Sequence, residues 1–202
     1  MLIKKNLKGF IFLINNFFIK FYTMLKKWIK ISEETIYSNN WWEYRKDLFE
    51  IPGINKGEYH YVYSRGSSMV IPLFDDGKIL FVNQYRYLND MFSIELPCGG
   101  VQKGYNYEQT ALKELEEETG YTSKNIEFIG EFNPFNGVTN EYCRVYLAEN
   151  LEKCISKPDL TEEFEIITLS LEEIYNYIIQ NKIWDGMTLA SLLLYEKKRG
   201  GK

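Results

Sequence analysis

The sequence contains one histidine, three cysteines and no long uninterrupted apolar run. The single histidine, His60, excludes any mechanism that needs two histidines, and a Ser-His-Asp triad is left only if His60 supplies it. Because His60 lies among aromatic residues in an expected strand, we expect a structural role for it. Cys98, Cys143 and Cys154 are odd in number and fit neither a zinc spacing nor a disulfide framework. We therefore expect reduced thiols and a cytoplasmic protein.

Residues 1–23 form the most apolar stretch, but two asparagines and Lys20 interrupt it. No apolar span of 18 residues results, and no small-residue cleavage site follows, so we expect no membrane-spanning helix and no signal peptide. An interfacial membrane anchor is an alternative to the flexible or additional N-terminal helix that we favour. A further hypothesis is that Met24 is the natural start, and mass spectrometry of the native protein would refute it by finding an intact Met1 terminus.

Basic charge is scarce outside the N-terminus. The net charge is −4, but residues 1–30 hold seven lysines and no acidic residue, which leaves −11 for the remainder. An acidic body without a basic patch and interleaved aromatic residues is a poor binder of nucleic acid, so we expect no nucleic-acid partner. A small anionic substrate that arrives with a metal ion remains compatible with this charge.

Glutamate is unusually dense, with four in the five residues 114–118. Asn106 followed by Gln109 has the spacing of a capping box, and Gly120 is suited to end a helix in the left-handed conformation. These signals predict a helix over residues 107–119.

Three of these glutamates share one face of the predicted helix. Glu114, Glu117 and Glu118 fall within an arc of about 100° beside an apolar stripe. Glu116 points elsewhere and is expected to be solvated. A solvated acidic face is the ordinary interpretation of a charge run. Here, however, like charges one turn apart repel, and neither Glu114 nor Glu117 has a lysine or arginine one turn on.

A divalent cation would relieve that repulsion, and ligands that are all oxygen favour Mg²⁺ or Mn²⁺ over zinc. The turn before the helix contains Gly99 and Gly100, so its backbone can approach a bound phosphate or metal without obstruction from side chains. A glycine-rich turn followed by a helix lined with carboxylates indicates metal-assisted phosphate chemistry.

The rest of the chain alternates between strand and helix signals. Residues 31–74 are rich in aromatics and predict two or three strands, with Tyr59, Tyr61 and Tyr63 on one face. That face is either a packing or dimer surface, or an aromatic clamp for a purine base. Further strands are expected over 79–87, 92–96, 126–132, 141–149 and 164–169. Capping residues Ser170 and Asp185 predict two final helices, with Ile174, Ile178, Ile179, Leu189, Leu192 and Leu193 facing the core.

The stretch from 99 to 121 resembles the Nudix hydrolase motif, G-x5-E-x7-R-E-U-x-E-E-x-G-U. The residues in register are Gly99, Glu114, Leu115, Glu117, Glu118, Gly120 and Tyr121. Two positions depart from the pattern, because Tyr105 replaces the early glutamate and Lys113 replaces the arginine. In the family that arginine orients the neighbouring glutamate, so Lys113 keeps the charge but loses the planar fork. Tyr105 bears on efficiency more than on chemistry.

Flanking segments resemble the ADP-ribose pyrophosphatase branch of that family. They are ISEE before Trp41, QYR ending at Arg86, ELP beginning at Glu95 and NPFNGVTNE after the helix. The resemblance implies an α/β fold, a Nudix-type α/β/α sandwich with a mixed sheet and an N-terminal antiparallel β extension. We expect an N-terminal extension over 1–23, strands for dimerisation and substrate binding over 24–66, and the hydrolase domain over 67–202.

The resemblance also implies an activity, the metal-dependent hydrolysis of a nucleoside diphosphate derivative. ADP-ribose giving AMP and ribose 5-phosphate is the leading case. Glu114, Glu118 and the carbonyl of Cys98 would hold Mg²⁺ or Mn²⁺, with Glu117 completing a further metal position. Glu163, with Glu162 as the fallback, or a helix glutamate such as Glu117 would accept the proton from the attacking water.

Substrate contacts follow from the same resemblance. Arg86 and Arg65 would grip the phosphates, and Glu95 belongs to the same site. Trp41 and one of Tyr59 or Tyr61 would sandwich the adenine, from different subunits of a homodimer with exchanged N-terminal strands. Two alternatives remain open at this point: a diphosphatase for another nucleotide sugar or a dinucleotide coenzyme, and a module that binds ADP-ribose or a nucleotide without cleaving it.

Overall fold

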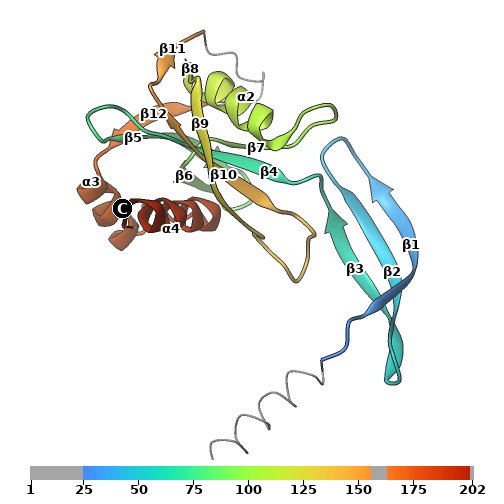
Figure 1. The fold of residues 1–202 in the computed structure, drawn as a ribbon. Coiled ribbons are helices and arrows are strands. Elements are labelled where there is room, and N and C mark those ends of the chain that lie inside the picture. The colour runs from blue at the N-terminus through green and yellow to red at the C-terminus, as the bar shows by residue number, and fades with distance from the viewer. Residues whose placement is uncertain (1–24, 156–162, 201–202) are drawn as a thin grey trace, which may run out of the picture. The chain divides into compact units, whose positions relative to one another are not determined.

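The computed structural model describes residues 25–155 and 163–200 (Figure 1). The expectations for residues 1–23, Met24 and Glu162 fall outside these ranges. Within them, no helix is both long and apolar enough to cross a bilayer. The described chain divides into two compact units, one made of residues 25–37 and 44–60 and the other of residues 38–43, 61–155 and 163–200.

The first unit holds most of a sheet of three strands in the order β1-β2-β3, whereas Ser38, Glu43 and residues 61–63 at the strand ends belong to the second unit. These strands are β1 (Ile29–Ser38), β2 (Glu43–Ile51) and β3 (Asn55–Tyr63). Trp28 stacks on Phe49 with ring centroids 4.3 Å apart. The hydroxyl of Tyr44 lies 2.8 Å from Nδ1 of His60, in keeping with a structural role for this histidine.

The second unit contains the remaining strands and all the described helices. They are β4 (Ser67–Pro72), β5 (Ile79–Arg86), β6 (Met91–Glu95), β7 (Cys98–Gly100), α2 (Tyr107–Thr119), β8 (Tyr121–Thr122), β9 (Asn125–Phe132), β10 (Cys143–Glu149), β11 (Glu152–Lys153), β12 (Glu165–Leu169), α3 (Leu171–Ile179) and α4 (Gly186–Gly200). The largest sheet has the order β7-β4-β10-β9 and is mixed, because β10 runs parallel to β4 while the other pairs are antiparallel. A second antiparallel sheet has the order β12-β5-β6.

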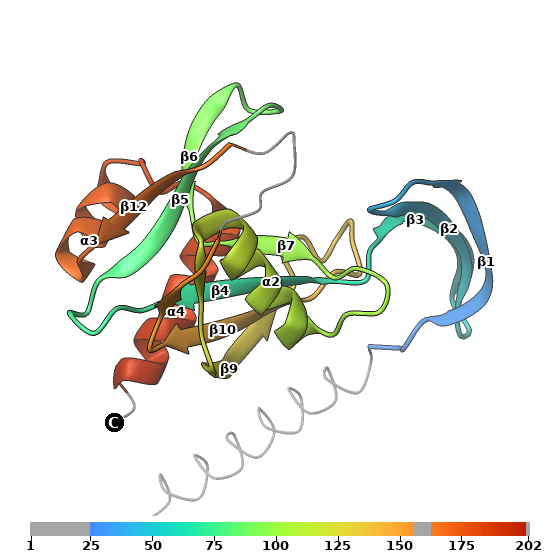
Figure 2. The ribbon, with the colours of Figure 1, turned by 90° about the horizontal axis from the view of Figure 1, so that it is seen from above.

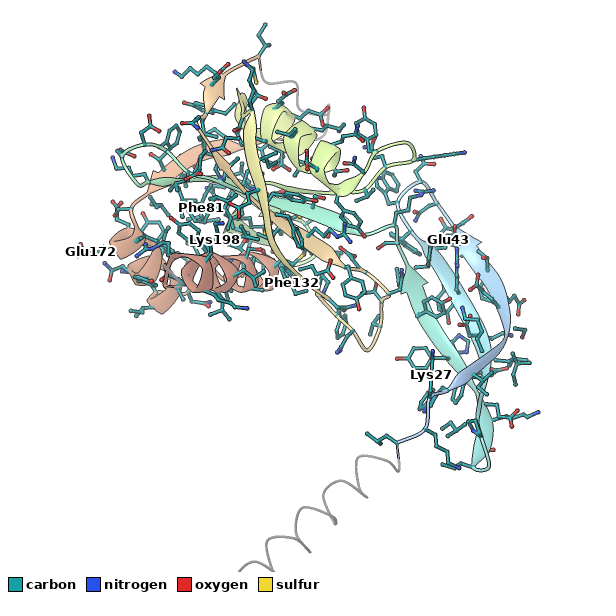
Figure 3. The ribbon with its side chains drawn as sticks, viewed as in Figure 1. Lys27, Glu43, Phe81, Phe132, Glu172 and Lys198 are labelled. Carbon is teal, nitrogen blue, oxygen red and sulfur yellow. The ribbon has the colours of Figure 1, made fainter. Side chains whose placement is uncertain are left out.

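Helices cover the mixed sheet on both faces, which gives the expected α/β/α sandwich. Val70 packs with Ala111 and Leu115 of α2, whereas Met69 faces a larger core that includes α3 and α4. Alternate residues of β4 thus point to opposite layers, as the pleat of a strand requires. Figure 2 looks onto α2 where it lies across β4 and β7. Phe81 of β5 is fully buried in the larger core (Figure 3).

Two details of the predicted pattern are wrong. Residues 31–74 contain parts of four strands rather than two or three. The additional strand, β4, is buried at all six positions and therefore shows no alternation of polar and apolar residues. Ile179 and Leu193, expected in the core, are 81% and 71% exposed.

The exposure of Leu193 has a physical reason. The buried stripe of α4 consists of Thr188, Ser191, Leu192 and Tyr195, at helical spacing. The Thr188 hydroxyl accepts the backbone N–H of Leu96 at 3.1 Å, and the Ser191 hydroxyl lies 2.9 Å from the Met69 sulfur. Small polar residues therefore occupy core positions that hydropathy assigns to leucines.

Candidate active site

Helix α2 begins and ends where the capping residues predict. The Asn106 side chain accepts the backbone N–H of Gln109 at 2.8 Å, and the Gln109 side chain accepts the backbone N–H of Asn106 at 3.0 Å. Gly120 ends the helix in the left-handed conformation with φ 69° and donates to the Glu116 carbonyl at 3.0 Å. The caps fix where α2 begins and ends, and the packing of Ala111 and Leu115 against Val70 sets which side chains face the sheet.

Two helix carboxylates converge on the backbone of β7. The Glu114 carboxylate lies directly against Gly99, since a Cβ placed on this glycine would be 2.2 Å from Cδ of Glu114 and 2.3 and 2.6 Å from its oxygens. The backbone N–H of Cys98 donates to Oε2 of Glu118 at 3.3 Å. The absence of a side chain at residue 99 is thus what allows a carboxylate to reach the turn.

Lys113 provides positive charge among these carboxylates. Its ammonium pairs with Glu117 at the i,i+4 spacing and lies 3.8 Å from Oε1 of Glu114. The repulsion between the helix glutamates is therefore relieved in part by a lysine that lies one turn before Glu117 rather than one turn after it.

Burial affects the charged and titratable groups where α2 meets β7. Glu118 is only 6% exposed, although an ionised carboxylate loses hydration when it is buried. The pKa of the Cys98 thiol is raised, first by its hydrogen bond with Cys143, then by burial and by the nearby carboxylates of Glu118 and Glu114. A protonated thiol is a poor metal ligand, so the raised pKa disfavours the Cys98 sulfur as a ligand.

The residues present fit a hard divalent cation. Glu114, Glu118 and the carbonyl of Cys98 are oxygen donors of the kind that Mg²⁺ prefers, and Gly99 leaves the space between helix and turn open to a carboxylate. Within the described ranges, no three His, Cys, Asp or Glu side chains converge as a ready metal cluster. Glu117 is instead engaged with Lys113.

Arg86 and Glu95 form one unit on neighbouring strands. Nε of Arg86 donates to Oε1 of Glu95 at 2.8 Å, and Nη2 donates to Oε2 of the same carboxylate. Glu95 is 3% exposed, whereas the Arg86 side chain is 45% exposed. The hydrogen bond to Glu95 raises the pKa of Arg86. Because Glu95 already occupies the bidentate edge of the guanidinium, an incoming phosphate would meet only the remaining N–H groups.

A small open pocket in the second unit brings Trp41 and Arg65 together. It is lined by Asn39, Asn40, Trp41, Trp42, Glu43, Tyr63, Ser64 and Arg65. The Asn39 side chain accepts the backbone N–H groups of Trp41 and Trp42, both at 2.9 Å, which holds the turn that carries the tryptophans. Trp41 is 77% exposed, so its ring is available to a ligand.

The other predicted site residues lie outside the pocket that contains Trp41 and Arg65. Tyr59 lies in the first unit, and Tyr61 is outside the pocket. Tyr63, the third residue of the alternating row of tyrosines, lines the pocket instead. Glu163 is exposed and precedes β12. Tyr105 is 46% exposed and lines an open groove on the outer side of α2.

Glu116 is exposed, as expected, and accepts the Thr122 hydroxyl at 2.7 Å. Its carboxylate is thereby directed away from β7. The face of α2 that meets β7 is therefore defined by Glu114 and Glu118, with Glu117 at its edge beside Lys113.

Comparison with known proteins adds an independent observation. The NUDIX domain model matches residues 64–188. The chain is 31% identical to an ADP-ribose pyrophosphatase of Bacillus subtilis (strain 168), over 83% of this chain and 92% of that protein. It is 32% identical to a methanol dehydrogenase activator of Bacillus methanolicus, over 80% and 89%. A crystal structure of an ADP compounds hydrolase superimposes with a TM-score of 0.76 at 16% identity, covering 88% of this chain and 96% of that one.

Proposed function

Because this chain belongs to the Nudix hydrolase family, we propose that it hydrolyses the diphosphate bond of a nucleoside diphosphate derivative, with ADP-ribose as the preferred substrate. The observation that carries the proposal is the approach of Glu114 and Glu118 to the backbone of Cys98 and Gly99. Carboxylates and a carbonyl in this arrangement suit the metal-assisted chemistry of phosphates. The relative of B. subtilis is named for ADP-ribose, which favours this substrate.

Helix α2 and the turn before it would supply the ligands of the metal ion. Glu114, Glu118 and the Cys98 carbonyl would hold Mg²⁺, or Mn²⁺ in its place, and Glu117 would complete a further position after exchanging Lys113 for the ion. The bound ion would neutralise the diphosphate and lower the pKa of the attacking water. Water would add its oxygen to one phosphorus while the bridging P–O bond breaks, which yields AMP and ribose 5-phosphate.

The test is a product screen. ADP-ribose, nucleotide sugars, dinucleotides and nucleoside triphosphates are incubated with the protein in Mg²⁺ and in excess chelator, and the products are separated by chromatography. We expect AMP from ADP-ribose in Mg²⁺ and none with chelator. If only another diphosphate compound is cleaved, that compound replaces ADP-ribose as the proposed substrate. If no compound is hydrolysed with either Mg²⁺ or Mn²⁺, the proposal is contradicted.

Glu163 is the proposed acceptor of the proton from water. It precedes β12. In that strand the Glu165 carboxylate accepts a hydrogen bond from the Asn83 side chain at 3.0 Å. We expect Glu163→Gln to lower kcat by about 10²-fold with little change in KM, since an amide cannot accept the proton. Glu165→Gln is the matched control and should retain kcat. If Glu163→Gln also retains kcat, the general base lies elsewhere.

Trp41 is the proposed stacking partner of the nucleobase. Because its ring is largely exposed, Trp41→Ala should fold normally. We expect a rise in KM of about tenfold with kcat nearly unchanged, the loss expected when a stacked base contact is removed. Tyr87→Ala removes an exposed aromatic ring outside the pocket and should leave KM unchanged. Equal KM values for Trp41→Ala and the wild type would refute the stacking role.

We also propose a cytoplasmic homodimer. Every residue of β1 is exposed, and large apolar side chains such as Ile31 and Ile36 are among them, which is an uncommon surface for a monomer. The three free thiols agree with a reducing compartment. Light scattering should give the mass of two chains, and the mass of one chain would exclude the dimer.

A further inference from the structure

Arg65 differs from the other arginines of the chain. Four of the five are paired with a carboxylate: Arg45 with Glu33, Arg86 with Glu95, Arg144 with Glu131 and Arg199 with Glu196. Arg65 is exposed and has no such partner among the described residues. A guanidinium beside aromatic rings and without a carboxylate is well suited to a phosphate group of a ligand.

The backbone that carries Arg65 is held by one side chain from a distant loop. The backbone N–H of Ser64 donates to Oδ1 of Asn140 at 3.0 Å, and Nδ2 of Asn140 donates to the Ser64 carbonyl at 3.1 Å. The backbones of the two segments are already paired at Val62, whose N–H donates to the Val138 carbonyl at 2.9 Å. The amide of Asn140 therefore acts like one more peptide of that ladder, placed next to Arg65.

Further contacts immobilise the same segment. The Tyr107 hydroxyl donates to the Arg65 carbonyl at 3.2 Å. Gly66 has φ +103°, and a Cβ at this position would be 2.3 Å from the Tyr107 hydroxyl oxygen. The Gly66 N–H donates to the Ser64 hydroxyl at 3.2 Å. Tyr107 is the first residue of α2, so the Arg65 segment is attached to the helix that carries the carboxylates.

We propose that Asn140 is a positioning residue for substrate binding, which fixes Ser64 and thereby directs Arg65 toward a phosphate of the bound nucleotide. This rests on the proposed function for the identity of the ligand. An asparagine is required because both a donor and an acceptor are used on one planar group. Leucine has nearly the same shape, introduces no charge and lacks both hydrogen bonds.

A double-mutant cycle tests this role. The affinity for AMP is measured by isothermal titration calorimetry for the wild type, Asn140→Leu, Arg65→Ala and the double variant. We expect Asn140→Leu and Arg65→Ala each to weaken binding by about tenfold, and the double variant to bind no more weakly than Arg65→Ala. Asn136→Leu, in the same loop, is the control and should bind like the wild type. If the leucine variant does not fold, Asn140→Ala replaces it.

Three results would overturn the assignment: unchanged affinity in Asn140→Leu, losses that add in the double variant, or no AMP binding by the wild type. Additive losses would mean that Asn140 acts independently of Arg65. Because AMP binding needs no hydrolysis, the cycle is separate from the proposed activity. A wild type that cleaves no diphosphate but shows the expected cycle would refute the activity and leave the role of Asn140 intact.

Discussion

Glu118→Gln is expected to lower kcat for ADP-ribose hydrolysis by about 10³-fold or more while the chain remains folded. Glutamine has the shape of glutamate and retains an oxygen that can accept the Cys98 N–H. It lacks the negative charge that would hold a divalent ion. Because glutamine has nearly the volume of glutamate and can accept the same hydrogen bond, the buried position should tolerate it and the melting temperature should stay close to that of the wild type.

Glu116→Gln is the control for this substitution. It makes the same chemical change on the same helix, but Glu116 is exposed and directed to Thr122. Its kcat should stay within about twofold of the wild type, as for a surface substitution away from the site. Turnover by Glu118→Gln at the wild-type rate would remove Glu118 from the mechanism.

Gly99→Ala is expected to lower kcat by on the order of 10³-fold, although it adds only a methyl group. The new Cβ would be 2.2 Å from Cδ of Glu114, so the carboxylate must move away from the turn. Only the end of a flexible side chain is displaced, and Gly99 does not have the positive φ that would strain an alanine. The fold should therefore tolerate the change while the ligand position is lost.

Gly100→Ala is the matched control, because a Cβ at this position meets no atom within 4 Å. Its kcat should be close to that of the wild type. In combination with Glu114→Gln, Gly99→Ala should cause little further loss, since both changes remove the same carboxylate from the turn. Equal activity of Gly99→Ala and Gly100→Ala would show that the Glu114 position is unimportant.

Local signals predicted the central element well. The capping box at Asn106 and the glycine at position 120 gave the bounds of α2, because each is satisfied by hydrogen bonds within a few residues. The helical period then placed Glu114 and Glu118 on one face. The glycine turn was also expected to admit close approach, and Gly99 meets the Glu114 carboxylate.

Contacts between distant segments could not be predicted in the same way. In the register of β5 and β6, Glu95 lies opposite Val82 and Arg86 lies opposite Met91, so the long Arg86 side chain must extend along the sheet to reach Glu95. The pocket around Trp41 needs Tyr63 and Arg65 to return to the turn at Asn39. Asn140 contacts Ser64 across 76 residues, and its sequence neighbourhood predicts only a loop. The resemblance to a family supplied several of these candidates where periodicity alone did not.

Direct binding of a metal ion to the carboxylates of α2 is the most stringent test of the proposed activity. Calorimetric titration of Mn²⁺ into the wild type, Glu118→Gln, Gly99→Ala and the control Gly100→Ala measures the affinity for the ion without any substrate. We expect saturable binding to the wild type and to Gly100→Ala, and affinity weaker by about tenfold or more in the other two variants. Equal affinity in all four proteins, or no binding to the wild type, would contradict the proposed activity.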